Sequence, residues 1–584
     1  MEKFADLEVH LPDGTIRGIK MEYQNKSIRA YRGIPFGKAP LGKLRFQIAD
    51  LIVDTTDGKV RGSEVIYQNK SIYAFRGIPF AKPPLGNLRF QAPVPAEPWE
   101  GVLDSNNTAV CCIQLDGPST LTNQTVNTTT QLLQQSEDCL HINVFTPNVN
   151  NTELLPVMFA IYGGGFKAGC ATDAVLVPYK LVNEGVIVVM ANYRLGVFGW
   201  LSTGDNVILG NAGFKDQLLA LKWVQKNIEQ FGGDPKKVTI FGESAGGISI
   251  GTHIVNKKSA GLYRAAICQS GCTLFKIELA SQDNPKQIAY NLAKFIDPTI
   301  SERNTTTQIK DFLQSQSVDV LSQAFLADPQ TGPIIEVEDS DAYVTEVAFP
   351  LLESGNFNQV PLIIGTTSAE GLMWYEDWSA LEATALKYDT NILSLIPYDL
   401  IPLDGVDLNK VANIIKETYV GNSGSFSKSL AAVIEYDSDT MFVTSALKQA
   451  ELQSKYTPVY FYEFSYEGIV SIFHIKVEGT EGNVMHTEDN YYIYPFLILP
   501  STKEDSLTGD KLVRLWTNFA KTLNPTPDQS DPLLNVTWPQ VSPMDIQYLD
   551  IGKTLDIKRG RRAKEFAMWN ETYYTYGKQP FIGF

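Results

Sequence analysis

The chain has few of the residues that bind metals or build disulfide frameworks. Only 6 cysteines and 5 histidines occur among its 584 residues, with no CxxC pair and no HExxH motif. Six cysteines are too few for a disulfide-rich scaffold, although one or two bridges fit the sequence. Cys268 and Cys272 form an isolated CxxxC without the second ligand pair that a zinc site needs. We therefore expect neither a metal nor a cofactor.

Positive charge and long apolar runs are also scarce. The formal net charge is −16 at pH 7 and the sequence pI is about 4.9. Phosphate backbones repel so acidic a chain, and nucleic acid is not an expected partner. The most apolar stretches, such as 185–191, are far shorter than the roughly 18 residues of a membrane-spanning helix. We expect a soluble globular protein without a transmembrane segment.

The signals for localisation disagree. The first residues lack the basic and then apolar order of a secretory signal peptide, which is typical of a cytoplasmic protein. Nine Asn-x-Ser/Thr sequons point instead to a glycoprotein. We favour a secreted, extracellular protein whose secretory start lies outside this sequence, with the cytoplasm as the alternative. The sequons are at Asn25, Asn69, Asn106, Asn123, Asn127, Asn150, Asn304, Asn535 and Asn570.

The N-terminal part of the chain contains one internal repeat. Residues 5–47 and 49–91 align without gaps, and 28 of the 43 positions are identical. Two copies are too few for a solenoid, which needs at least about three units sharing a core. Only the second copy continues into the remainder of the chain. We therefore expect 1–47 to be a duplicated segment surplus to the fold, and 48–584 to be a single domain.

From residue 57 onward, short apolar runs alternate with amphipathic stretches. This order predicts a doubly wound, mostly parallel sheet. The mainly helical regions 304–326 and 379–453 are expected to cover its catalytic edge. The predicted strands are 155–162, 186–193, 238–241, 360–366 and 459–464, and the predicted helices include 216–230 and 246–255.

The sequence GESAG at 242–246 lies between a predicted strand and a predicted helix. This is the context of a nucleophile elbow, in which Ser244 has strained backbone angles and its neighbours must be small. Gly242 and Gly246 meet that requirement. A structural serine in a glycine turn is the alternative, but the flanking strand and helix favour a catalytic nucleophile.

A second glycine-rich segment, YGGGF at 162–166, follows another predicted strand. An acyl-transfer enzyme needs backbone N–H groups about 3 Å from the developing oxyanion, where a Cβ atom would interfere. We expect Gly164 and Gly165 to donate to the oxyanion, with Ala245 as the third donor. The alternative, a flexible linker, fits poorly after a buried strand.

Of the five histidines, His486 is the best candidate for the general base. It lies in a loop late in the chain, after both of its expected partners. The others are at positions 10, 141, 253 and 474, in the first repeat copy, a strand, a helix and an apolar stretch. For the acid that orients the imidazole, Glu370 follows a strand and a small-residue loop. Asp489 is the runner-up, and position alone does not decide between them.

At this point the sequence resembles the type-B carboxylesterase/cholinesterase family. The matching blocks include FRGIPFAKPPLGNLRF (75–90), EDCLHINVFTP (137–147) and ANYRLGVFGWLSTGD (191–205). GTTSAEG (365–371) is similar to the family's acid loop and VMHTED (484–489) to its histidine loop, which favours Glu370 and His486. The resemblance implies an α/β-hydrolase fold with helical insertions and a carboxylic ester as substrate.

The resemblance also implies a disulfide between Cys112 and Cys139, with Cys111 as a competitor. The family's second bridge is in doubt here, because Cys268 and Cys272 are too close together in sequence. The loop between the first two cysteines has no tryptophan, so it offers no aromatic face to a quaternary ammonium and argues against choline esters. GESAG in place of GQSAG favours a general carboxylesterase over a juvenile hormone esterase.

Two further hypotheses compete with a serine esterase. A catalytically silent adhesion or binding homologue would have no physical need for an intact serine, histidine, acid and glycine loop together. A lipase or a juvenile-hormone-type esterase would use the same chemistry on another substrate. We expect ester hydrolysis through an acyl-enzyme intermediate, with a small-molecule ester as the partner.

Overall fold

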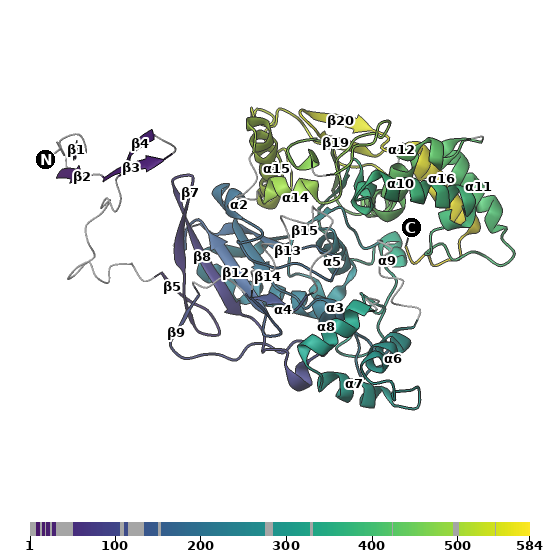
Figure 1. Cartoon of the computed structure of the whole chain (residues 1–584), viewed down its shortest axis with the longest axis horizontal. Coiled ribbons are helices and arrows are strands. Elements are labelled where there is room, and N and C mark those ends of the chain that lie inside the picture. The colour runs from purple at the N-terminus through teal and green to yellow at the C-terminus, as the bar shows by residue number, and fades with distance from the viewer. Residues whose placement is uncertain are drawn as a thin grey trace. The chain divides into compact units, whose positions relative to one another are not determined.

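A computed structural model of the chain divides into two compact units, Met1–Leu51 and Ile52–Phe584 (Figure 1). The boundary lies just beyond the first copy of the repeat. The structure describes residues 8–11, 14–17, 19–23, 26–30, 51–105, 110–114, 134–149, 153–274, 284–327, 331–422, 424–472, 474–494, 501–543 and 545–583.

The first unit contains two β-hairpins. One joins β1 (Glu8–Leu11) to β2 (Gly14–Arg17), and the other joins β3 (Ile19–Tyr23) to β4 (Lys26–Ala30). The second copy of the repeat forms the same two hairpins in the same register, as β5–β6 and β7–β8. The shared sequence YQNK connects the strands of the second hairpin in both copies. The two copies therefore share the same strand pairing, although many of the paired residues differ.

The second unit is built on an 11-stranded sheet in the order β20-β19-β18-β17-β16-β15-β13-β14-β12-β8-β7. The strands from β14 to β19 pair in parallel, whereas both margins are antiparallel. The prediction of a mostly parallel sheet is confirmed. The bounds are β7 Ser63–Tyr67, β8 Lys70–Pro79, β12 His141–Thr146, β13 Leu155–Ile161, β14 Ile187–Ala191, β15 Gly233–Glu243, β16 Ala265–Gln269, β17 Leu362–Thr367, β18 Val459–Phe464, β19 Gln547–Ile551 and β20 Leu555–Arg559.

Two small sheets accompany the large one. A three-stranded sheet joins β5 (Ile52–Asp54), β6 (Lys59–Arg61) and β9 (Val102–Asp104), and a short pair joins β10 (Cys111–Cys112) to β11 (Gln135–Ser136). The five predicted strands correspond to β13, β14, β15, β17 and β18. They are recognisable from sequence because both faces of these central strands are buried, which requires continuous apolar runs.

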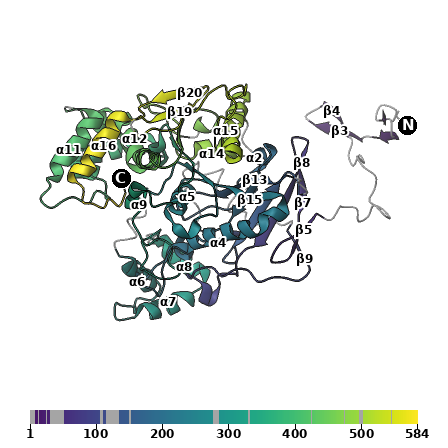
Figure 2. The same cartoon turned by 180° about the vertical axis from the view of Figure 1, so that it is seen from behind.

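Helices cover both faces of the parallel strands. In both views α2 and α15 lie on one side of β13 and β15, and α4 lies on the other (Figures 1 and 2). In the described ranges, no helix is long and apolar enough to cross a membrane. The helices are α2 Tyr179–Asn183, α3 Gly196–Trp200, α4 Ala212–Asn227, α5 Ala245–Val255, α6 Pro285–Ile296, α7 Thr306–Gln314, α8 Val318–Ala327, α9 Ala348–Ser354, α10 Trp378–Thr390, α11 Leu408–Val420, α12 Leu430–Ser438, α13 Thr444–Gln453, α14 Glu488–Ile493, α15 Lys503–Thr522 and α16 Ala563–Tyr576.

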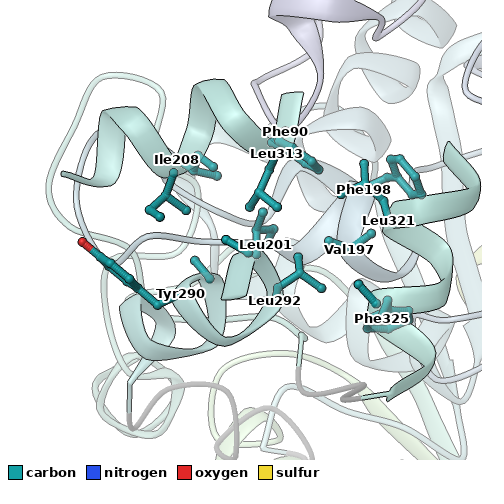
Figure 3. Packing of buried hydrophobic residues seen from close by; sticks show 14 of the residues in the cluster. Phe90, Val197, Phe198, Leu201, Ile208, Tyr290, Leu292, Leu313, Leu321 and Phe325 are labelled. Atoms are coloured by element: carbon teal, nitrogen blue, oxygen red, sulfur yellow. The ribbon is translucent and has the colours of Figure 1, made fainter. Parts of the chain in front are cut away.

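An apolar cluster attaches α6, α7 and α8 to the body of the second unit (Figure 3). Leu292, Leu313 and Phe325 from these helices belong to this cluster together with Phe198 of α3. Phe90, at the end of the second repeat copy, belongs to the same cluster and is only 3% exposed. The second copy is therefore built into the interior of the unit.

Two disulfides lie near one end of the sheet. Cys112 is bonded to Cys139, the pairing that the family resemblance implies. Cys111, considered above as a competitor for that bond, is instead bonded to Cys170. The adjacent cysteines lie on strand β10, where consecutive side chains point to opposite sides, so each reaches a different partner. Cys268 and Cys272 are buried and take no part in a disulfide.

A buried ion pair fixes the segment that follows β14. Nε and Nη2 of Arg194 donate to the two carboxylate oxygens of Asp216 at 2.8 and 2.6 Å, and the Arg194 amide donates to the same carboxylate at 3.0 Å. The two side chains are 3% and 0% exposed. This bidentate pair ties the start of α3 to α4.

We predict that Asp216→Ala lowers the free energy of unfolding by about 3–5 kcal/mol, because it leaves a buried guanidinium without its counter-ion. Urea denaturation followed by tryptophan fluorescence measures the change. Glu97→Gln is the matched control, since Glu97 pairs with Lys82 on the surface and its loss is expected to change little. Equal stability of the two variants would contradict the structural role of the buried pair.

Candidate active site

Ser244 lies on a tight turn between β15 and α5, as the sequence predicts. Its backbone angles, φ 56° and ψ −125°, are strained for a residue with a side chain. The turn is possible because its neighbours are glycines. A Cβ atom at Gly242 or Gly246 would lie 2.5 or 2.1 Å from the carbonyl oxygen of Ile161, at the end of the adjacent strand β13. The turn therefore presents the Ser244 hydroxyl at the carboxyl edge of the sheet.

His486 connects Ser244 to Glu370. Its Nε2 lies 2.9 Å from Ser244 Oγ, and its Nδ1 lies 2.6 Å from Glu370 Oε2. The imidazole is 3% exposed and the carboxylate is fully buried. The structure thus brings together the three residues that the sequence singled out. With a proton on Nδ1 donated to Glu370, the neutral ring presents its Nε2 lone pair to the serine hydroxyl.

Glu370 is fixed by hydrogen bonds to its other oxygen. Oε1 accepts from the Thr367 amide at 2.7 Å and from Ser270 Oγ at 2.5 Å. Glu370 follows β17 and Ser270 follows the neighbouring strand β16, while Ser244 follows β15. Because the carboxyl ends of parallel strands meet at one edge, three consecutive strands of the sheet contribute to this hydrogen-bonded chain.

The histidine loop is held from two directions. The Ala369 amide donates to the Val484 carbonyl at 2.9 Å, which joins the acid loop to the histidine loop. On the other side, the ring of Phe442 stacks on His486 with centroids 4.3 Å apart. Phe442 belongs to a π-helical segment, Asp439–Val443, between α12 and α13. Such segments recur at functional sites, where they displace one side chain from the regular helical pattern.

Several carboxylates raise the pKa of His486. Burial acts in the opposite direction, because it disfavours the charged imidazolium. The charge of Glu370, its hydrogen bond to the ring and the charges of Glu243 and Asp489 together outweigh this effect. Burial in turn raises the pKa of Glu243 to about 7 and that of Asp489 to about 6. The site therefore favours a positive charge on the ring, which a general base acquires during catalysis.

The glycine segment after β13 approaches Ser244 closely. A Cβ atom at Gly163 would lie 3.0 Å from Ser244 Cβ, and Gly164 and Gly165 have φ values of 109° and 61° that favour glycine. Within the part of the chain that the structure describes, the amides of Gly164 and Gly165 make no hydrogen bond to protein. The Ala245 amide opens helix α5, where N–H groups have no intrahelical partner. No described residue therefore accepts a hydrogen bond from any of the three predicted donors.

The other sequence candidates of the second unit have different hydrogen-bond partners. Asp489 Oδ2 accepts from Gln269 and Tyr462, so its contacts are structural. His253 is buried and bonded to Tyr343 and Gln217, and His474 binds Glu488. His141 is on β12, and His10 is on β1 of the first unit. In the described ranges, no group of three or more His, Cys, Asp or Glu side chains could hold a metal ion.

Sequence reasoning missed three residues at the site. Glu243, Ser270 and Phe442 contact the Ser244–His486–Glu370 chain, although none of them was a candidate. Ser270 could have been found from the rule that adjacent parallel strands end at one edge. Glu243 stands inside the GESAG motif, but its orientation depends on the turn. No sequence signal points to Phe442, because a π-helical segment has no recognisable pattern.

Comparisons with known proteins agree with this geometry. The model of the carboxylesterase family matches residues 5–51 and again 49–569. Venom carboxylesterase-6 of Apis mellifera is 32% identical over 567 residues, which cover 93% of this chain and 90% of that protein. Pyrethroid hydrolase Ces2e of Rattus norvegicus is 32% identical over 576 residues, covering 96% and 88%. The crystal structure of juvenile hormone esterase from Manduca sexta, with OTFP covalently attached, matches with a TM-score of 0.76 and 27% identity, covering 90% of this chain and 99% of that one.

An α/β-hydrolase fold with a serine, a histidine and a carboxylate at its carboxyl edge defines a class of serine hydrolases. The chain belongs to the carboxylesterase family. It is a serine hydrolase that cleaves carboxylic esters, and the α/β-hydrolase fold implied by the resemblance is confirmed. A catalytically silent binding homologue is not favoured.

Proposed function

We propose that the chain hydrolyses small-molecule carboxylic esters through an acyl-enzyme intermediate on Ser244. His486 takes the Ser244 proton as Oγ attacks the ester carbonyl, and a tetrahedral intermediate forms. His486 then gives the proton to the leaving alcohol as the C–O bond breaks. A water molecule repeats the sequence on the acyl-enzyme, with His486 again as base, and the carboxylate product leaves.

Glu370 orients the imidazole and stabilises its protonated form without itself taking the proton. The amides of Gly164, Gly165 and Ala245 donate to the oxyanion of each tetrahedral intermediate. The observation that carries the proposal is the continuous chain from Ser244 Oγ through His486 to Glu370, with contacts of 2.9 and 2.6 Å. Neither a metal nor a cofactor takes part in these steps.

We predict that Ser244→Ala lowers kcat for a short-chain p-nitrophenyl ester by at least about 10⁴-fold, because the acyl-enzyme can no longer form. Adding His486→Ala is expected to cost little more, since the two side chains act as a unit. Ser354→Ala, on an exposed serine at the end of α9, is the matched control and keeps full activity. Undiminished turnover by Ser244→Ala would overturn the assignment of the nucleophile.

We also infer that the protein is extracellular and glycosylated. Two disulfides are typical of proteins that fold in an oxidising compartment. The sequon residues Asn69 and Asn535 are exposed, as attachment of a glycan requires. One relative is named for venom, a secreted fluid.

We further propose that residues 1–47 are surplus to the fold of 48–584. In the second copy, Arg89 donates to both oxygens of Glu137 at 2.6 Å, and Phe90 belongs to the apolar cluster that includes residues of α7 and α8. The first copy has Arg45 and Phe46 at the matching positions. Glu137 can form this bidentate pair with a single arginine, and Arg89 of the second copy occupies it. The double match of the family model to the N-terminal region supports a duplication.

We predict that deleting residues 1–47 leaves esterase activity and the melting temperature unchanged. A matched pair of substitutions identifies the copy that is used. Phe90→Ala is expected to lower the free energy of unfolding by about 3–5 kcal/mol, the usual loss for a buried phenylalanine, whereas Phe46→Ala changes nothing. Calorimetry on the full chain measures both variants. The reverse pattern, with loss at Phe46 only, would show that the first copy is the one built into the domain.

A further inference from the structure

Thr487, directly after His486, has an unusual backbone conformation. Its φ of 76° lies in the left-handed region, which β-branched residues rarely adopt. Thr487 also occupies the N-cap position of α14, where a threonine side chain ordinarily accepts a hydrogen bond from a helix amide. Here it makes no capping bond. The residue therefore carries a conformational cost that its position in the helix does not offset.

The Thr487 hydroxyl instead donates to Glu243 Oε1 at 2.6 Å. Glu243 is the residue before Ser244, and it is 5% exposed. One hydrogen bond thus joins Glu243, next to the nucleophile, to Thr487, next to the general base. The carboxylate also abuts the glycine segment, because a Cβ atom at Gly163 would lie 2.7 Å from Glu243 Oε2.

The same oxygen of Glu243 competes for His486. Nε2 lies 3.3 Å from Glu243 Oε1, at ion-pair distance, while its hydrogen bond is made with Ser244 Oγ at 2.9 Å. When the ring is protonated, its Nε2 proton can be donated either to Ser244 Oγ or to Glu243 Oε1. Transfer to the leaving alcohol requires the proton to stay on the Ser244 side. A proton bound toward Glu243 is withheld from the reaction.

We propose that Thr487 is a positioning residue for ester hydrolysis: its hydroxyl saturates the Glu243 oxygen nearest to His486 and keeps the Nε2 proton directed at Ser244. The inference rests on the proposed roles of Ser244 and His486. A hydroxyl donor at 2.6 Å satisfies the carboxylate oxygen, so the more distant Nε2 gains less by turning toward it. The strained backbone of Thr487 is what brings the hydroxyl to that oxygen.

Loss of the hydroxyl has a predictable effect on protonation. The hydrogen bond from Thr487 lowers the pKa of Glu243, which burial raises, so its removal raises that pKa further. An unsatisfied carboxylate also favours the protonated form of His486. Both effects make the Glu243–His486 pair keep its proton to higher pH. The acid limb of the pH profile of kcat therefore shifts to higher pH. The ionisable groups that face the pair are Glu370, Asp489, Tyr193, Tyr462 and Tyr491.

The test compares kcat, KM and the pH profile of kcat for wild type, Thr487→Val, Thr487→Ser and Thr487→Gly on a p-nitrophenyl ester. The valine variant keeps the shape and loses the hydroxyl. We expect its kcat to fall about 10- to 100-fold, the effect of one hydrogen bond to a charged group, with little change in KM. Its acid limb moves to higher pH. The serine variant keeps the hydroxyl and stays close to wild type.

The glycine variant separates backbone strain from the hydroxyl, because glycine adopts this φ without strain and the fold is retained. We expect it to be as slow as the valine variant. Full activity of either variant, or a serine variant as slow as valine, overturns the proposal. A wild type that fails to turn over the ester, or turns it over undiminished after Ser244→Ala, would instead contradict the proposed function.

Discussion

The site depends on the turn that connects β15 to α5 at Ser244. Its strained backbone is tolerated only because Gly242 and Gly246 leave room for the Ile161 carbonyl of the neighbouring strand. The same close approach brings the glycine segment after β13 against Ser244. One steric requirement therefore places the nucleophile and the amides of Gly164 and Gly165 beside each other. The positive end of the dipole of α5, which begins at Ala245, lies at the same place.

The second constraint is electrostatic. The charges of three buried carboxylates, those of Glu370, Glu243 and Asp489, act on a single imidazole. In this environment the ring readily becomes positive, whereas two of the carboxylates have raised pKa values. The direction in which His486 Nε2 donates its proton is then as important as its affinity for that proton. Fixed donors to the carboxylates, such as Ser270 on Glu370 and Thr487 on Glu243, leave the proton on Nε2 with Ser244 as its nearest acceptor.

The sequence predicts those features that local patterns encode. Ser244 could be found because a strand, small residues and a helix must surround such a turn, and the buried parallel strands could be found from their apolar runs. Glu370 is different. Its distance from His486 is set by the order of the strands and by loops that no periodicity describes, so the family resemblance was needed to prefer it to Asp489.

Other features depend on tertiary contacts alone. Cys111 and Cys112 are adjacent on β10 and point to opposite sides of the strand. Cys111 therefore reaches Cys170, whereas Cys112 reaches Cys139. The contact of Phe442 with His486 depends on a π-helical segment within a long helix. The repeat is visible in the sequence, and the continuation of the second copy into the remainder of the chain favours that copy as part of the domain, but the contacts that this copy makes could not be predicted. In the structure, Arg89 and Phe90 of the second copy contact Glu137 and the apolar cluster that contains Phe198.

The most direct test of the account is covalent labelling by a fluorophosphonate, with the modified peptide identified by mass spectrometry. The account predicts one phosphonate per chain, attached to Ser244, since this hydroxyl has an imidazole base at 2.9 Å and predicted amide donors beside it, a combination not found at another hydroxyl among the described residues. Labelling should be far slower after His486→Ala, although Ser244 is still present. Attachment to another serine, or an active enzyme that takes no label, would contradict the account.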